Sequence, residues 1–160
     1  EMQRPDFDHY FMGLAMAVRK RANCLGSRVG AVVVKEWRVL STGYNGTPSK
    51  MPNCLDGGCE RCAHPEKYES GKGYDLCICV HAEQNAVLMA ARHGNSVEGG
   101  TLYSTLRPCV GCLKGAIQAG IEELVFEDNH VYPEELENAY RQLVSEAGIR
   151  VRRSAGVAGS

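Results

Sequence analysis

The sequence lacks the features that mark a membrane protein, a secreted protein or a large nucleic-acid binder. None of its apolar runs approaches the roughly 20 residues that cross a bilayer. Its 18 Lys and Arg residues nearly balance 19 Asp and Glu residues, for a formal net charge of -1, whereas nucleic-acid surfaces are usually clearly basic. The first residues, Glu1 to Arg4, are polar and resemble no secretory signal. We therefore expect a cytoplasmic protein with neither a membrane nor a nucleic-acid partner.

Cysteine is the exception to this plain composition, with eight residues in a chain of 160. Two pairs, Cys59/Cys62 and Cys109/Cys112, have the C-x-x-C spacing. A chain of this length can bury a sizeable core, so it does not need a disulfide framework. Thiols that bind metal in a reducing compartment are therefore a better explanation than disulfides.

Helical and extended patterns alternate along the chain. The order predicts an α/β protein with a three-layer α/β/α fold and a mixed central sheet of about five strands. Helices are predicted at Asp6–Ala22, His81–His93, Cys109–Ala119 and Pro133–Ala147, the last with Pro133 at its first position. Strands are predicted at Val29–Val34, Val39–Tyr44, Thr101–Ser104, Ile121–Phe126 and Ile149–Arg152. The length predicts a single domain over residues 1–153, followed by a disordered tail at 154–160.

A cysteine-rich insertion at about residues 45–80 interrupts this alternation. It sustains no period and is rich in Gly, Pro and Cys. A loop this long inside a compact domain is unusual unless function or a staple explains it. Cysteine-bound metal would be such a staple.

Two short motifs open the second and third predicted helices. One is His81-Ala82-Glu83, and the other is the run Pro108 to Cys112. Catalytic zinc typically has three protein ligands and one open position for water. His81, Cys109 and Cys112 supply such a set. Cys109 and Cys112 are three positions apart, so their side chains share one face of the predicted helix. The helix N-terminus favours both thiolates. Glu83 lies close enough to act on the water without binding the metal.

The two motifs together form the H-x-E and P-C-x-x-C signature of zinc deaminases. With them, the chain resembles the cytidine and deoxycytidylate deaminase superfamily over most of its length, from Phe7 to Ile149. Three more segments carry the resemblance: Arg28–Val34, the Gly-Tyr-Asn-Gly run at 43–46, and Thr101–Cys109.

The resemblance implies hydrolysis of dCMP to dUMP and ammonia, feeding thymidylate synthesis. In relatives, zinc activates water for attack on C4 of cytosine, and the residue matching Glu83 moves the protons. The family pattern also implies substrate contacts. They are Asn45 with the sugar or phosphate, Arg28 with the phosphate, the backbone near Ala82 and Ser104 with the base, and Tyr132 near the base.

Relatives with a second, structural zinc imply further ligands in the insertion. Cys24, Cys54 and Cys59 match this pattern, with Cys79 or Cys77 as the fourth ligand. Cys62 and His64 are additional candidates, so the ligand set stays open and a further metal is conceivable. The resemblance also implies a homo-oligomer (a dimer or hexamer) and regulation by dCTP and dTTP, with Mg²⁺ accompanying a nucleotide effector.

Two alternatives remain at the level of sequence. One is a related deaminase that acts on dCTP, on a guanine-like or pterin-like base, or on tRNA adenosine. The Gly43–Gly46 run and the cysteine-rich insertion favour an enzyme that acts on a free mononucleotide over these other deaminases. The other is a zinc-stabilised binding module without catalysis, which the intact Glu83 disfavours.

Overall fold

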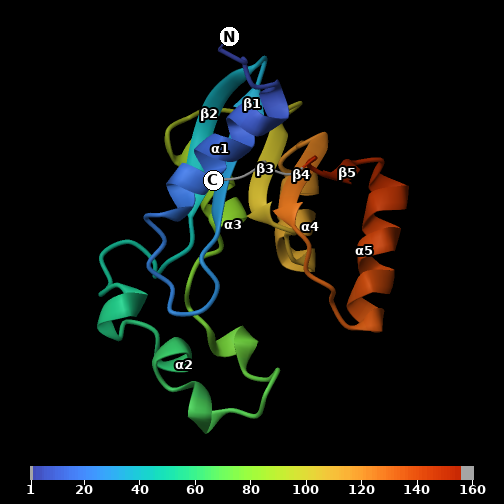
Figure 1. The fold of residues 1–160 in the computed structure, drawn as a ribbon. Coiled ribbons are helices and arrows are strands. Elements are labelled where there is room, and N and C mark those ends of the chain that lie inside the picture. Colours follow the sequence, from blue (N-terminus) through green and yellow to red (C-terminus); the bar gives the residue numbers. More distant parts are fainter. Residues whose placement is uncertain (1, 156–160) are drawn as a thin grey trace.

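A computed structural model describes residues 2–155 of the chain, and its centre is one five-stranded sheet (Figure 1). The strands lie in the order β2-β1-β3-β4-β5. Their bounds are β1 Gly30–Lys35, β2 Arg38–Tyr44, β3 Thr101–Leu106, β4 Glu123–Asp128 and β5 Arg150–Arg153. β1 runs antiparallel to β2 and β3, whereas β3, β4 and β5 are parallel. The predicted mixed sheet is confirmed.

Helices cover both faces of this sheet. α1 (Phe7–Arg19) lies on one face, where Phe11 and Met12 pack against Val32 and Val34 of β1. The alternate residues of β1 face the other way and join a core built with α3 (Ala82–Arg92), α4 (Val110–Gln118) and α5 (Glu134–Ala147). This switch follows from the two-residue period of a strand. The three-layer arrangement is therefore as predicted.

Local signals explain where the helices begin and end. Asp6 caps α1 by accepting a hydrogen bond of 2.9 Å from the backbone N–H of His9. α1 ends at Arg19 rather than Ala22, because residues 20–22 bond three positions back instead of four. Pro133 is the N-cap of α5, not its first helical residue, and it has extended ψ. Gly148, at φ 72°, ends α5 as predicted.

α3 approaches β2 so closely that only glycine fits at position 43. A Cβ at Gly43 would lie 2.2 Å from the carbonyl oxygen of Ala82 and 2.4 Å from the backbone nitrogen of Ala86. The contact fixes the first turn of α3 against the sheet. It thereby sets the position of His81, which precedes that turn.

The insertion projects away from the sheet and has little regular structure (Figure 1). It contains the four-residue helix α2 (Glu60–Ala63) and 3₁₀ turns at Cys54–Asp56, Pro65–Lys67 and Tyr74–Leu76. Its two ends meet where Gly46 and Val80 exchange backbone hydrogen bonds of 3.2 and 2.7 Å. The insertion is thus closed at its neck.

The chain beyond β5 begins with Ser154, at the start of the predicted tail. Its backbone N–H donates a 2.8 Å hydrogen bond to the Phe126 carbonyl of β4. Residues 156–160 of that tail lie outside the described residues. Among residues 2–155, no helix has the length and apolar content needed to cross a membrane.

Candidate active site and metal centre

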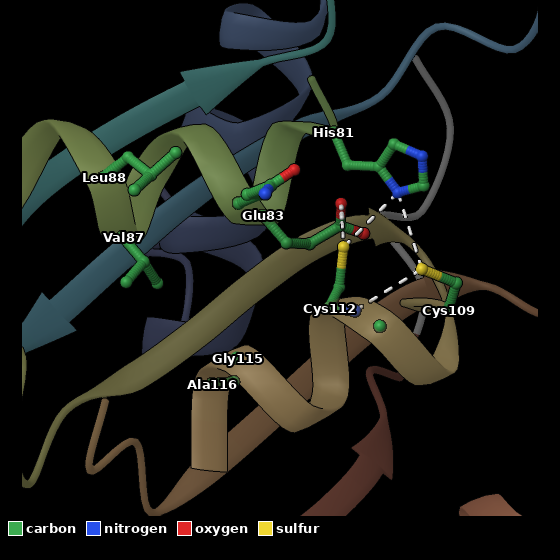
Figure 2. A pocket seen from close by; sticks show the side chains of 10 residues that line it. His81, Glu83, Val87, Leu88, Cys109, Cys112, Gly115 and Ala116 are labelled. Carbon is green, nitrogen blue, oxygen red and sulfur yellow. Dashed lines mark hydrogen bonds between the residues drawn. The ribbon is translucent and has the colours of Figure 1, made fainter. Parts of the chain in front are cut away.

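Two helix N-termini meet at the carboxyl end of β3 (Figure 2). His81 is the N-cap of α3, and Cys109 is the N-cap of α4. The Cys109 sulfur accepts a 3.4 Å hydrogen bond from the backbone N–H of Cys112, so both sulfur atoms lie at the start of the same helix. Each helix start offers backbone N–H groups and a positive dipole end, which favour anionic ligands such as thiolates.

The three predicted ligands have the spacing that zinc requires. Nδ1 of His81 lies 3.5 Å from Sγ of Cys109 and 3.4 Å from Sγ of Cys112. In a tetrahedral site with ordinary Zn–N and Zn–S bonds, the nitrogen-to-sulfur separation is about 3.6 Å. All three ligand atoms lie within 4.8 Å of one another. These residues therefore fit zinc with one coordination position left for a non-protein ligand.

The two sulfur atoms share a proton unequally. Hydrogen bonding from the Cys112 thiol lowers the pKa of Cys109 to about 4, with His81 adding to the effect. The same contact with Cys109 raises the pKa of Cys112. A bound metal cation would stabilise both sulfur atoms as thiolates, so the two would no longer compete for one proton.

Glu83 stands behind the ligands as a buried carboxyl group. It is only 5% exposed, and its Oε2 lies 3.8 Å from Sγ of Cys112 (Figure 2). Burial raises the pKa of Glu83, and a 2.9 Å hydrogen bond from the hydroxyl of Ser104 offsets part of that rise. Sequence reasoning placed Ser104 at the site through its backbone. The hydroxyl contact with Glu83 was missed.

The ligands and Glu83 line one end of a cavity of about 350 Å³. Val87 and Leu88 of α3 and Gly115 and Ala116 of α4 line its other end (Figure 2). His81 is exposed, while Glu83 and Cys112 are buried. The site is therefore open to solvent on the histidine side and closed on the carboxylate side.

A bidentate ion pair braces the segment that leads into α4. Arg107 donates to both carboxylate oxygens of Glu137, at 2.6 and 2.9 Å, and its guanidinium lies 4.0 Å from the ring centre of Tyr140. Arg107 lowers the pKa of Glu137 to about 2. Tyr132 donates a 3.1 Å hydrogen bond from its hydroxyl to the Arg107 carbonyl. The ion pair joins residues thirty positions apart, and no local pattern in the sequence signals it.

Asn45 directly follows β2, and its side chain binds the loop before β1 that carries Arg28. The Asn45 side chain accepts a 2.8 Å hydrogen bond from the backbone N–H of Val29 and donates one of 2.6 Å to the Ser27 carbonyl. Asn45 therefore fixes the loop that carries Arg28, which is exposed. Ala82 is fully buried under β2, as the Gly43 contact requires.

The other six cysteines lie together, five from the insertion and Cys24 from the loop before β1, and they divide into two overlapping groups. One group is Cys24, Cys54, Cys62 and Cys79, and the other is Cys59, Cys62, Cys77 and Cys79. The quartet expected from sequence is therefore split, because Cys62 takes the place of Cys59 beside Cys24 and Cys54. His64 belongs to neither group and instead lies 3.2 Å from a carboxylate oxygen of Glu66. None of the eight cysteines, all of which the structure describes, forms a disulfide.

Comparison with known proteins identifies the family. The model of the cytidine and deoxycytidylate deaminase zinc-binding region matches residues 5–128, which include both motifs. The chain belongs to this family. The range matched by the deaminase model includes His81, Cys109 and Cys112, the zinc ligands that the sequence motifs predict.

Relatives within the deaminase family include deoxycytidylate deaminases. The chain is 40% identical to the enzyme of Saccharomyces cerevisiae over 152 residues, covering 95% of this chain and 46% of that protein. It is 43% identical to the enzyme of Mycobacterium phage D29 over 128 residues, covering 78% of this chain and 97% of that protein. Among the relatives it matches, the chain thus spans about half the length of the yeast protein.

A solved structure of the same family has a similar fold. The dCMP deaminase from the cyanophage S-TIM5, crystallised in complex with dCMP and dUMP, superposes with a TM-score of 0.71 at 27% identity. The superposition covers 96% of this chain and 100% of that one. The structural similarity therefore covers nearly the whole chain, including C-terminal elements beyond the residues 5–128 that the family model matches.

Proposed function

We propose that this chain is a zinc-dependent deaminase that hydrolyses dCMP to dUMP and ammonia. One observation carries the proposal: a buried carboxyl group, Glu83, lies next to a His-Cys-Cys ligand set at two helix N-termini. The names of the relatives support the choice of substrate. The product dUMP would then supply thymidylate synthesis.

The chemistry requires one group that both accepts and returns protons. Zinc held by His81, Cys109 and Cys112 would lower the pKa of water and so supply the nucleophile. Glu83 accepts a proton from the water that attacks C4 of cytosine, delivers it to N3 and assists protonation of the departing amine. Overall, one water is consumed and one ammonia leaves. The Ser104 hydroxyl holds Glu83 in place through Oε1, and Oε2, which faces the ligand Cys112, is the oxygen proposed for these transfers.

Substrate binding would use the loop before β1 and the segments beside the site. Arg28 is the proposed phosphate contact, since a guanidinium binds phosphate through two parallel hydrogen bonds. Asn45 supports it by fixing the Ser27–Val29 backbone and is the proposed neighbour of the sugar. Tyr132 and the backbone near Ala82 and Ser104 are the proposed contacts of the base.

A substrate panel tests this proposal. Ammonia release is measured with dCMP, dCTP, cytidine and tRNA at equal concentrations. We expect the largest kcat/KM with dCMP and a loss of at least tenfold for cytidine, because cytidine lacks the charge that Arg28 would bind. If kcat/KM is higher with dCTP or with tRNA than with dCMP, that molecule becomes the proposed substrate in place of dCMP. Failure to release ammonia from any of the four would contradict the proposal.

We also propose a metal site, an assembly, a form of regulation and a location for this protein. We infer a structural zinc in the insertion, a homo-oligomer, regulation by dCTP and dTTP with Mg²⁺, and a cytoplasmic location. Eight free thiols support a reducing compartment. Sedimentation with and without dCTP and Mg²⁺ measures the assembly and its response to effectors.

A further inference from the structure

The insertion has an inverted core. Cys54 and Cys59 are fully buried, and Cys24 and Cys79 are nearly so, with Cys62 and Cys77 packed against them. The large apolar side chains of the same segment are exposed instead; they are Met51, Leu55, Tyr74, Leu76 and Ile78. If the hydrophobic effect alone shaped this segment, these large apolar side chains would be buried at its centre. Sulfur at the centre of a segment with so little regular structure indicates metal ligands.

The sulfur atoms are spaced as ligands of tetrahedral metal ions. Sγ of Cys24 lies 4.0 Å from Sγ of Cys62, and Sγ of Cys59 lies 3.9 Å from Sγ of Cys77. Sγ of Cys62 and Sγ of Cys77 are 3.6 Å apart. Two sulfur ligands of one tetrahedral zinc are about 3.8 Å apart, given Zn–S bonds of about 2.3 Å. The sulfur atom of Cys62 thus lies near the distance expected between two ligands of one zinc ion from both Cys24 and Cys77.

Two cysteines belong to both groups of four. Cys62 and Cys79 each lie within 4.8 Å of Cys24 and Cys54 in one group, and of Cys59 and Cys77 in the other. A single zinc ion bound by either group would leave two thiols beside it without a metal, either Cys59 and the partly buried Cys77 or the buried pair Cys24 and Cys54. Two tetrahedral ions need eight ligand positions, and two shared sulfur atoms allow six cysteines to fill them all.

We propose that the insertion binds two zinc ions in one binuclear thiolate cluster. Cys24 and Cys54 are terminal ligands of one ion, Cys59 and Cys77 are terminal ligands of the other, and Cys62 and Cys79 bridge the two. Six thiols release six protons to the solvent as they bind two divalent cations, so the cluster has a net charge of minus two and no oxidation is involved. The backbone N–H of Leu25 donates to Sγ of Cys54 at 3.4 Å, which stabilises the thiolate. Soft sulfur ligands in tetrahedral sets favour zinc over magnesium or calcium.

The cluster would also position the catalytic histidine. Bridging Cys79 is two residues before His81, and Val80 between them is paired with Gly46 at the neck of the insertion. Cys24 lies shortly before the Ser27–Val29 loop that Asn45 holds. The cluster therefore anchors two segments that lead directly into the proposed active site. Its role there is that of a positioning group and not of a catalyst.

Metal counting on the intact chain gives the first test. Native mass spectrometry of the full chain purified with zinc should show three zinc ions per chain, two in the insertion and one at His81. In the His81→Ala variant the count should fall to two. A wild-type count of two, together with two cysteines that react with iodoacetamide under native conditions, would overturn the proposal in favour of one structural zinc.

Cadmium NMR on the same full chain tests the bridges directly. With ¹¹³Cd in place of zinc, the β protons of Cys62 and Cys79 should each correlate with two cadmium signals, and those of the other four insertion cysteines with one. Finding only single correlations for Cys62 and Cys79 would overturn the bridging arrangement. Because this measurement uses the wild-type chain, it does not depend on whether a variant folds, and it does not depend on deaminase activity.

Variants provide a matched comparison. Cys62→Ala should shift both insertion signals, whereas Cys24→Ala should shift mainly the signal of its own ion. His64→Ala is the control, because His64 belongs to neither sulfur group and contacts Glu66 and Glu60 instead. It should retain the full metal count. Loss of an insertion metal in His64→Ala would contradict the all-sulfur ligand set.

Discussion

The His81 site and the insertion use the same sulfur chemistry on different scaffolds. His81, Cys109 and Cys112 stand at the ends of α3 and α4, which are packed on the sheet. The other six cysteines lie on loops, a 3₁₀ turn and the four-residue helix α2, outside the strands of the sheet. The first ligand set is therefore held in place by the fold, whereas the second, with the proposed metal bound, would hold its own segment in place.

The difference between the two scaffolds corresponds to two roles of metal ions in proteins, catalytic and structural. A catalytic ion needs ligands that stay in place while one coordination position exchanges water and substrate. A structural ion needs a closed set of ligands, and its binding free energy stabilises the folded state. The helix-cap geometry of the first set and the inverted core of the second correspond to these two needs.

The largest expected effect concerns the carboxylate beside the catalytic ligands. Glu83→Gln should lower kcat/KM for dCMP by about 1,000-fold, because proton transfer by a positioned side chain contributes 10² to 10⁴ in rate. Zinc content should be unchanged, since Glu83 is outside the ligand group. Glu135→Gln, in the exposed first turn of α5, is the matched control and should keep wild-type activity.

Removing metal should affect the two regions unequally. In the presence of a chelator, amide hydrogen exchange should accelerate on the order of 100-fold within residues 54–79, because little else holds that segment. Amides of β1, β3 and β4 should keep their protection. Exchange followed by mass spectrometry measures both regions in one sample. An insertion that remains protected after complete metal loss would show that its scaffold is independent of metal.

A smaller effect is expected from the hydroxyl that holds the carboxylate. Ser104→Ala should lower kcat about tenfold with little change in KM, because it removes the 2.9 Å hydrogen bond that orients Glu83. Ser41→Ala is the control. Its hydroxyl donates a 2.6 Å hydrogen bond to the Ala86 carbonyl, away from the catalytic ligands, so it should affect stability and leave kcat unchanged. Equal losses of kcat in the two variants would remove the positioning role of Ser104.

The smallest effect tests the sheet scaffold away from both metal regions. Arg152 and the Tyr103 hydroxyl lower the pKa of Asp8, which joins α1 to β5 and β3. Because the folded-state pKa lies below the unfolded value, this stabilisation is present above about pH 4. It is lost as the pH falls through the lowered pKa.

Asp8→Asn should therefore cost about 1 kcal/mol at pH 7, a modest value because the partly exposed pair is screened by solvent. The difference from wild type should shrink as the pH is lowered from 5 to 3. Urea unfolding of both proteins at each pH measures it. Asp75→Asn, at an exposed position, should show no such trend. A difference that grows on acidification would contradict the direction of the pKa shift.

The sequence predicted that His81, Cys109 and Cys112 come together, because local signals place them. Two motifs mark helix starts, and the alternation of strands and helices predicts that the helices pack on one sheet. It could not predict the Ser104–Glu83 contact or the Arg107–Glu137 ion pair. Each depends on how separate elements pack in three dimensions, and neither leaves a local pattern.

The insertion shows where this reasoning ends. Sequence spacing indicated metal, and the family resemblance grouped Cys59 with Cys24, Cys54 and either Cys79 or Cys77, with Cys62 and His64 left as further candidates. The path of the loop instead places Cys62, in α2, between the two groups. An irregular segment has no period from which such a path can be derived. Boundary errors in the helices and strands were small by comparison, since caps and glycines mark most of them.

The most direct test of the account measures product from dCMP. Zinc-loaded wild-type chain and the His81→Ala and His64→Ala variants are incubated with dCMP, and dUMP and ammonium are quantified together. We predict equal amounts of the two products from the wild type and from His64→Ala, and none from His81→Ala. Deamination by His81→Ala at the wild-type rate, or unreacted dCMP with the fully loaded wild type, would contradict the account.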